Sequence, residues 1–189
     1  MKEAPKKMIV AISGASSIQL GLRMIEEVSK RTNCYVILSK SSQIVWEKEQ
    51  GRDLSKELEG LEVEIHEEIY SSLASGSFGA DAMAIVPTSM NTLAKIAYGM
   101  SEDLICRCAS VMLKEKNPLL LVPREMPFSS IALENMLKLS NLGVIIAPPI
   151  LGYYAKIKSL EEMENFLVGK WLDVLGFSNT LYKRWGENR

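Results

Sequence analysis

The sequence has few of the residues that build disulfide frameworks and metal sites. It holds three cysteines, Cys34, Cys106 and Cys108, and a single histidine, His66. Three cysteines cannot form a disulfide framework, and the Cys106-x-Cys108 spacing matches neither a zinc knuckle nor a redox pair. We therefore expect small, buried cysteine side chains in a reducing compartment, and no structural or catalytic metal.

The sequence also lacks an excess of one charge and any long apolar run. The 22 Lys and Arg residues against 23 Asp and Glu residues leave a formal net charge of −1, which argues against general nucleic-acid binding. No apolar run approaches the roughly 20 residues that span a bilayer. The run at 8–12 is too short for a secretory signal. The expected location is the cytoplasm, with neither a membrane nor nucleic acid as partner.

Apolar residues in short runs are what the chain does have. Hydrophobic residues make up 47% of its 189 residues, enough to bury a core. A length close to the typical domain size of about 150 residues predicts one domain. We expect a single domain over 1–189, with its core at about 8–176 and a polar C-terminal tail.

Continuous apolar runs without alternation are typical of parallel strands that are covered on both faces. Five such runs lie at 8–12, 35–38, 82–86, 119–122 and 144–146. A weak sixth strand is expected at 62–65, inside an irregular Glu-rich stretch, and Pro87 is expected to end the third run.

Helices are expected between the strands, because apolar residues there recur at helical spacing. They lie at about 20–28, 41–49, 91–98, 102–114, 131–142 and 160–175. Thr88-Ser89 is typical of a helix N-cap, and Gly143 of a C-terminal stop. Alternating strands and helices predict an α/β, doubly wound parallel sheet with helices on both faces, of the flavodoxin-like or Rossmann-like type.

Hydroxyl-bearing turns follow the predicted strands. In an open parallel sheet, ligands bind beyond the carboxyl ends of the strands. The residues there are 13–16, Ser39, 88–92 and Arg124-Glu125. Hydroxyls, helix N-termini and a fixed cation suit a phosphate group. Helix capping alone would explain any one of these serines, but three such turns on one edge favour an anion site.

Two familiar phosphate motifs are missing. Gly14-Ala15-Ser16-Ser17 does not match G-x-G-x-x-G, and no G-x-x-x-x-G-K-[ST] occurs, so dinucleotide binding and ATP hydrolysis are disfavoured. A mononucleotide such as FMN fits this type of sheet better.

A set of short segments, in order along the chain, points to one family. The segments are Gly14-Ala15-Ser16, Ala74-Ser75-Gly76-Ser77, Pro87-Thr88-Ser89-Met90-Asn91-Thr92-Leu93, Leu113-Lys114-Glu115, Val122-Pro123-Arg124-Glu125, Leu133-Glu134-Asn135-Met136-Leu137 and Gly152-Tyr153-Tyr154. In order and spacing, this set resembles the UbiX-type flavin prenyltransferases over nearly everything from Met8 to Gly176. Proteins of that family bind FMN and join a dimethylallyl group to N5 and C6 of reduced flavin. The product is prenylated FMN, the cofactor of UbiD-type decarboxylases.

The resemblance implies a role for each matching residue. Tyr154 and Lys170 would hold the phosphate of dimethylallyl phosphate, with Arg124 and Lys114 nearby. Glu49 and Glu125 match acid/base carboxylates, and Arg107 matches a further basic position; Ser16 counts with these as well as with the flavin contacts. FMN contacts would fall on Gly14, Ala15, Ser16, Ser39, Ser89, Met90, Asn91, Thr92 and Arg124. The family also implies a homo-oligomer, a dodecamer with active sites at subunit contacts.

These residue types suit the cleavage of an allylic C–O bond. Lys and Arg stabilise the charge on the departing phosphate, and Tyr154 can donate a hydrogen bond to it. A carboxylate near N5 can take the proton that the flavin releases. A structural interpretation also stays open, since Arg107 and Lys114 share one predicted helix and Lys170 follows Phe166 by four residues; such residues are often a solvated face.

The chain departs from the family pattern at four positions. Ser17, Thr88, Asn91 and Ala155 stand where the family commonly has Gly, Cys, Lys and His. These changes leave open whether the donor is a phosphate or a diphosphate.

Two other functions stay open. One is an FMN-dependent decarboxylase of the peptidyl-cysteine or phosphopantothenoylcysteine type; its active-site histidine has only His66, in a polar stretch, as a counterpart. The other is a non-catalytic FMN carrier subunit, which would need neither Tyr154 nor Lys170.

Overall fold

The short apolar runs form the strands of one parallel sheet. The computed structural model describes residues 4–186. Its strands follow the order β3-β2-β1-β4-β5-β6, and each neighbouring pair is parallel. Their bounds are β1 (Lys7–Ile12), β2 (Asn33–Leu38), β3 (Val63–His66), β4 (Ala82–Thr88), β5 (Leu119–Pro123) and β6 (Ile145–Ile146). The predicted doubly wound sheet is confirmed, and its order is the Rossmann order.

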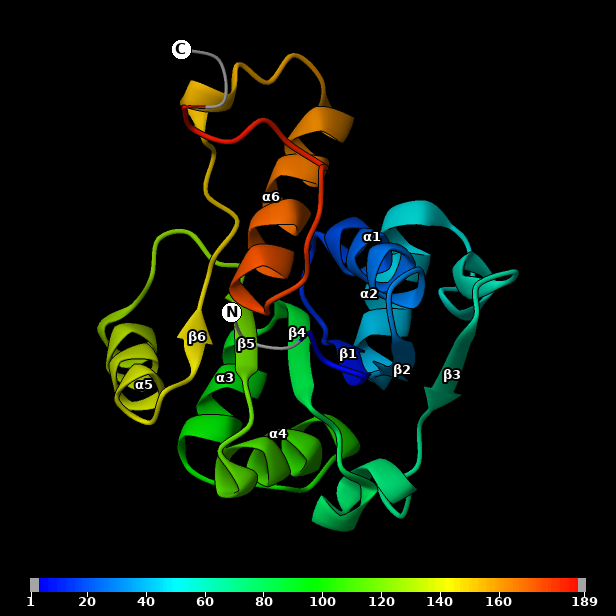
Figure 1. Cartoon of the computed structure of the whole chain (residues 1–189). Coiled ribbons are helices and arrows are strands. Elements are labelled where there is room, and N and C mark those ends of the chain that lie inside the picture. Colours follow the sequence, from blue (N-terminus) through cyan, green and yellow to red (C-terminus); the bar gives the residue numbers. More distant parts are fainter. Residues whose placement is uncertain (1–3, 187–189) are drawn as a thin grey trace.

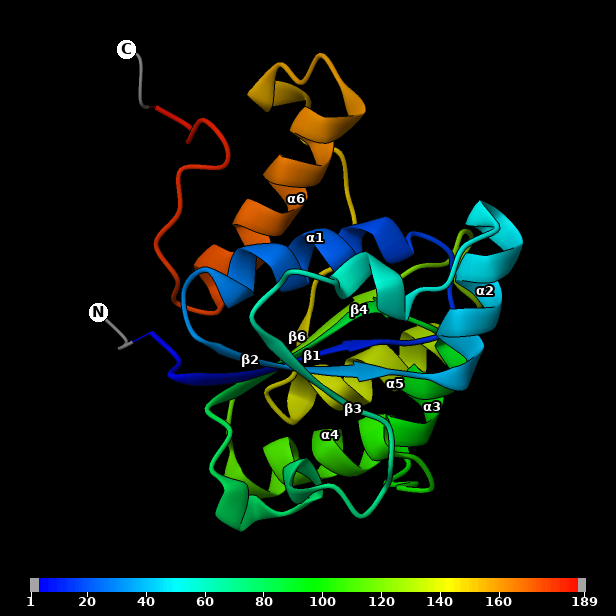
Figure 2. The same cartoon turned by 90° about the vertical axis from the view of Figure 1, so that its right-hand side faces the viewer.

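Helices cover both faces of this sheet. α1 and α6 lie on one face, and α3, α4 and α5 lie on the other (Figures 1 and 2). The α-helices are α1 (Ile18–Ser29), α2 (Lys40–Gln50), α3 (Met90–Ala97), α4 (Leu104–Glu115), α5 (Ser130–Asn141) and α6 (Leu160–Val174). Short 3-10 turns are η1 (Ser55–Leu58), η2 (Ser72–Ala74), η3 (Gly76–Phe78) and η4 (Tyr153–Ala155).

Burial on both faces explains why the strands are apolar without interruption. Residues 8–12 of β1 are all 0% exposed. Met8, Val10 and Ile12 pack into the core under α1 and α6, whereas Ile9 and Ala11 pack into the core on the opposite face. This alternation is the two-residue period of a strand between two helical layers.

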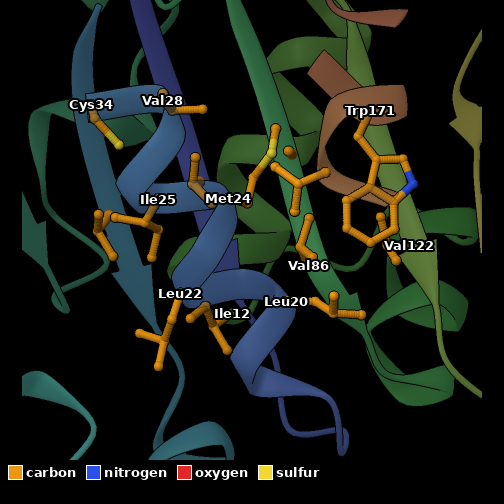
Figure 3. Close-up of a cluster of buried hydrophobic side chains, with 14 of the residues drawn as sticks. Ile12, Leu20, Leu22, Met24, Ile25, Val28, Cys34, Val86, Val122 and Trp171 are labelled. Carbon is orange, nitrogen blue, oxygen red and sulfur yellow. The ribbon is translucent and has the colours of Figure 1, made fainter. Parts of the chain in front are cut away.

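α1 lies close against the sheet. A Cβ atom at Gly21 would be 2.2 Å from Val86 O and 3.0 Å from the Ile12 side chain, so the helix needs a glycine where it crosses β4. In Figure 3, Trp171 of α6 lies beside Val122 of β5, and its indole Nε1 donates to Ala147 O at 3.1 Å. α1 and α6 together therefore close this face of the core.

The prediction that Pro87 ends the third strand was wrong. β4 continues to Thr88, and its pairing with β5 shifts register between Ile85 and Thr88. The proline has no N–H to donate, and a bulge accommodates it. The buried Thr88 hydroxyl bridges the bulge: it donates to Ile85 O at 2.7 Å and accepts from Val122 N at 3.0 Å. Thr88 thus belongs to the sheet, and Ser89 alone caps the next helix.

The three cysteines are buried, as predicted. Burial raises the pKa of each of Cys34, Cys106 and Cys108 to about 12. Thiols that stay protonated at neutral pH are poor nucleophiles, so these side chains serve packing.

Candidate active site

The strand order reverses between β1 and β4, which places a crevice at the carboxyl ends of these two strands. Ser13, which follows β1, is 1% exposed. Its hydroxyl donates to Pro87 O at 2.9 Å and accepts from Ser89 N at 2.7 Å. Ser39 N donates to Ile12 O at 3.1 Å. The three predicted turns therefore lie side by side, and we call 13–17, Ser39 and 88–92 the strand-end turns.

Two of the turn serines cap helices. Ser39 Oγ accepts from Ser42 N at 3.0 Å, and Ser89 Oγ accepts from Thr92 N at 3.2 Å. Capping therefore accounts for these hydroxyls in the present structure.

The N-terminus of α1 differs from the others. Ser17 has a left-handed backbone, with φ of 77°, and makes no side-chain cap hydrogen bond. Within residues 4–186, the other five α-helices each have a side-chain cap. The first N–H groups of α1 consequently lack a side-chain acceptor at the carboxyl edge of the sheet, where an anion would satisfy them.

Arg124 supplies a cation at the same edge. Its backbone N–H donates to Thr88 O at 3.3 Å. Its Nε is buried and has no hydrogen-bond partner within the described part of the chain. A buried guanidinium N–H without an acceptor is costly, and a phosphate or flavin oxygen would satisfy it. The residues at this edge therefore fit an anionic mononucleotide such as FMN. Glu125 follows, exposed, and accepts from Met126 N at 3.0 Å.

Close packing explains why a glycine stands at position 14. A Cβ atom there would lie 2.4 Å from Ser41 Cβ, so the turn approaches the start of α2 too closely for a side chain. Around the crevice, Ala15 is buried, Ser16, Met90 and Thr92 are half-buried and Asn91 is exposed. The structure thus places all the predicted flavin contacts along one edge of the sheet.

Glu49 lies apart from these turns. It is exposed in the last turn of α2, ten residues after the cap at Ser39. Figure 2 shows α2 rising across the carboxyl edge of the sheet, so Glu49 lies at the far end of that helix.

Arg107 and Lys114 form a second group, on α4. Arg107 Nε donates to Ala74 O at 3.3 Å, and a Cβ atom at Gly76 would lie 3.2 Å from Lys114 Nζ. The last residue of η3 accepts from Lys7 Nζ at 3.0 Å, and Lys7 begins β1. This group therefore extends to the amino edge of the sheet. The structure does not bring it to the strand-end turns of the same chain.

Tyr154 and Lys170 form a third group. The Tyr154 ring packs edge-on against Phe166, with centroids 5.7 Å apart, and Phe166 packs against Tyr182 at 5.3 Å. Lys170 Nζ lies 5.9 Å from the centroid of the Tyr182 ring. The structure thus places both predicted donor residues at the ends of one row, Tyr154–Phe166–Tyr182–Lys170, which we call the α6 row. Figure 1 shows η4 and the start of α6 projecting away from the sheet.

Two further aromatic residues in this neighbourhood were not predicted from the sequence. Tyr182 lies between Phe166 and Lys170, and the Trp185 ring packs edge-on against Tyr154 at 5.4 Å. Both belong to the tail that we expected to be only polar. Two aromatic residues three positions apart in a polar segment were the available signal.

Residues 4–186 hold no group of three or more His, Cys, Asp or Glu side chains that is arranged to bind a metal ion. No helix in this range has the length and apolar character needed to cross a bilayer.

Comparison with known proteins defines the class. A family model described as Flavoprotein matches residues 1–172. The chain with this Rossmann-ordered sheet is therefore a flavoprotein.

Individual relatives define the family. The flavin prenyltransferase UbiX of Helicobacter pylori (strain ATCC 700392 / 26695) is 50% identical over 186 residues, covering 96% of this chain and 100% of that protein. AnUbiX (PadA1), solved in complex with FMN and dimethylallyl pyrophosphate, aligns with a TM-score of 0.90 and 34% identity, covering 97% and 99% of the two chains. A dodecameric FMN-dependent UbiX-like decarboxylase from Escherichia coli O157:H7 aligns with a TM-score of 0.88 and 33% identity, covering 95% and 98%. The chain belongs to the UbiX family of flavin prenyltransferases.

Proposed function

We propose that this enzyme transfers a dimethylallyl group from dimethylallyl phosphate to reduced FMN, and that a UbiD-type decarboxylase uses the prenylated FMN. The observation that carries the flavin half is the buried Nε of Arg124, which has no hydrogen-bond partner in the described part of the chain and lies at the same edge of the sheet as the start of α1. A buried N–H without a partner costs free energy, and an anion bound beside it would offset this cost.

The strand-end turns and Arg124 are the proposed flavin-binding residues. Reduced FMN, when bound, supplies the acceptor atoms N5 and C6. The N–H groups at the start of α1 and the Arg124 guanidinium would bind its anionic and polar oxygens. Within this edge we assign flavin contacts to Gly14, Ala15, Ser16, Ser39, Ser89, Met90, Asn91, Thr92 and Arg124.

The proposed donor-binding residues are Tyr154 and Lys170 of the α6 row and Arg107 and Lys114 of α4. Lys170, Lys114 and Arg107 would stabilise the negative charge that develops on the departing phosphate, and the Tyr154 hydroxyl would donate a hydrogen bond to it. Glu125, exposed at the flavin edge, is suited to accept a proton, and Glu49 is the second acid/base candidate.

Because these groups lie at separate places on one chain, we infer that the active site forms where subunits meet. α5 exposes several apolar side chains: Ile131, Leu133 and Leu137 are 68%, 53% and 63% exposed. Apolar patches of this kind are typical of contact surfaces. A dodecamer, the state of the Escherichia coli relative, would supply such contacts. We also propose a cytoplasmic location, which the three unpaired, buried thiols support.

The test is anaerobic incubation of the enzyme with reduced FMN and dimethylallyl phosphate, followed by mass spectrometry of the flavin. We expect a flavin that carries one added five-carbon unit. A parallel reaction with dimethylallyl diphosphate identifies the preferred donor. If FMN binds but its mass changes with neither donor, prenyl transfer is excluded and a carrier role is supported.

A further inference from the structure

The segment after α6 folds back along that helix (Figure 1). We call residues 177–185 the strap. Asn179 Nδ2 donates to Gly169 O at 3.0 Å, and a Cβ atom at Gly169 would lie 2.5 Å from Tyr182 Cδ1. Glycine is a poor residue for a helix interior. At Gly169, the strap occupies the space that a side chain would fill.

Asp173 of α6 anchors the strap. It accepts hydrogen bonds from Asn179 Nδ2 at 2.8 Å and from the Tyr182 hydroxyl at 2.5 Å. Arg184 contacts both carboxylate oxygens, at 2.6 and 2.7 Å. Burial and the hydrogen bond to Asp173 raise the pKa of Tyr182 to about 12, so its hydroxyl remains a donor at neutral pH. Three strap residues therefore converge on one carboxylate.

The strap also contacts both ends of the α6 row. The Tyr182 ring packs on Phe166 and lies 5.9 Å from Lys170 Nζ. At the other end, Trp185 packs against Tyr154. The aromatic surface beside Lys170 is thus supplied by the strap and not by α6 itself.

We propose that the strap, anchored at Asp173, positions Lys170 and Tyr154 to bind the phosphate of the prenyl donor. This rests on the proposed function, which assigns the phosphate to those two side chains. A lysine side chain has many rotamers, so a ring that restricts its ammonium lowers the entropic cost of binding an anion. Tyr182 and Asp173 are positioning residues, because they act through Lys170.

The first test is Tyr182→Ala, which removes the ring. We expect the KM for dimethylallyl phosphate to rise about tenfold, as for a lost contact to a charged group. The Kd for FMN should not change, because the strap partners described above lie on α6 and η4. Tyr182→Phe keeps the ring and should have a smaller effect.

Tyr98→Ala is the matched control. Lys138 Nζ lies 4.1 Å from the centroid of the Tyr98 ring, which is the same type of contact away from α6. We expect the KM of this variant to equal that of the wild type. A tenfold rise here as well would overturn the proposal, because the effect would not be specific to the strap.

Asp173→Asn tests the anchor without removing a ring. We expect a raised KM for dimethylallyl phosphate and faster trypsin cleavage after Lys183 and Arg184, because the strap is released. If Asp173→Asn and Tyr182→Ala both leave KM unchanged, the strap does not position the donor site.

A double-mutant cycle separates positioning from general destabilisation. If Tyr182 acts through Lys170, Tyr182→Ala adds nothing to KM in a Lys170→Ala background, whereas independent effects would multiply and contradict the proposal. Failure of the proposed function is distinguishable: Lys170→Ala alone would then leave the KM for dimethylallyl phosphate unchanged.

Discussion

The strand-end turns and the α6 row hold their polar groups in different ways. At the turns, the buried Ser13 hydroxyl and backbone N–H groups fix three segments whose positions the sheet already determines. In the α6 row, side chains pack on side chains; Tyr154 is 44% exposed, and Trp185 of the strap, which packs against it, is 74% exposed. The fold itself builds the first region, whereas the second depends on side-chain contacts with the strap.

This difference matches the two proposed ligands. FMN is large and would need a site formed in advance, which backbone donors and a buried arginine provide. A small prenyl phosphate needs a few cations and an apolar surface, which exposed side chains can supply once subunits enclose them. Changes at the two regions should therefore affect different ligands.

The largest expected effect is on flavin affinity. Arg124→Ala should raise the Kd for FMN by roughly 10- to 100-fold, equivalent to about 1.5–3 kcal/mol for hydrogen bonds to a charged group. Titration by quenching of FMN fluorescence measures this. Arg52→Ala removes an equal charge from an exposed side chain and should bind FMN like the wild type. An unchanged Kd in Arg124→Ala would show that FMN does not bind at this edge of the sheet.

The next effect is the reciprocal one. Lys170→Ala and Tyr154→Phe should each lower kcat/KM for dimethylallyl phosphate about tenfold, because each loses one polar contact to the phosphate. Steady-state assays of prenylated flavin measure this, and the Kd for FMN should remain unchanged. Lys56→Ala, an exposed lysine elsewhere, is the control. A parallel loss of FMN affinity would show that the two regions are not separate.

Thr88 tests how the sheet holds the turns. Thr88→Val removes the buried hydroxyl that bridges Ile85 O and Val122 N, and should cost about 1–3 kcal/mol of unfolding free energy. Thermal or urea unfolding measures this cost. Thr88→Ser keeps the hydroxyl and should retain most of the stability. Equal losses in both variants would show that the hydroxyl contributes no more to stability than the methyl group that Thr88→Ser removes.

Much of the sheet and its edge could be predicted from the sequence, because the signals are local. The run at 8–12 and the caps at Ser39 and Ser89 depend on a few neighbouring residues. The end of β4 was not predictable from Pro87, because it depends on a bulge and on a hydrogen bond from the distant Val122.

The site was less predictable, because its groups come from distant segments. Family resemblance pointed to Lys170 and Tyr154, but the Tyr182 ring that joins them comes from the tail. Nothing local in Arg107 or Lys114 shows that their helix face extends to the amino edge of the sheet.

Glu27 on α1 leads to a prediction of how the stability of the fold depends on pH. Burial alone would raise its pKa, but hydrogen bonds from Lys30 and Arg31 outweigh this effect and hold the pKa below the ordinary value of a glutamate. The pKa of Glu27 is therefore lower in the folded state than in the unfolded state. Its carboxylate stabilises the fold at a pH above the unfolded-state pKa, and this stabilisation is lost as the pH falls through the folded-state pKa.

Glu27→Gln should therefore lower the unfolding free energy at pH 7 by about 1–2 kcal/mol. The difference from the wild type should shrink as the pH falls through the folded-state pKa of Glu27. Urea unfolding across pH measures it, with Glu26→Gln, a more exposed member of the same cluster, as a control with a smaller loss. A difference independent of pH would contradict the ionic account.

The smallest effect is expected at Ser17. Its left-handed backbone, with φ of 77°, is costly for a residue with a side chain, so Ser17→Gly should stabilise the fold by up to about 1 kcal/mol. A thermal melt measures this. Ser16→Gly, one residue earlier and without a positive φ, should not stabilise. A lower Tm for Ser17→Gly would show that the Ser17 side chain stabilises the fold by more than its left-handed backbone costs.

Subunit mixing is the most direct test of a site built from two regions on different chains. Arg124→Ala and Lys170→Ala each disable one region, and the two variants are unfolded, mixed and refolded into hybrid oligomers. We predict that the mixture forms prenylated FMN faster than either variant refolded alone, because some sites pair intact strand-end turns with an intact α6 row from a neighbour. A mixture no more active than its components would contradict the account and place each site within one chain.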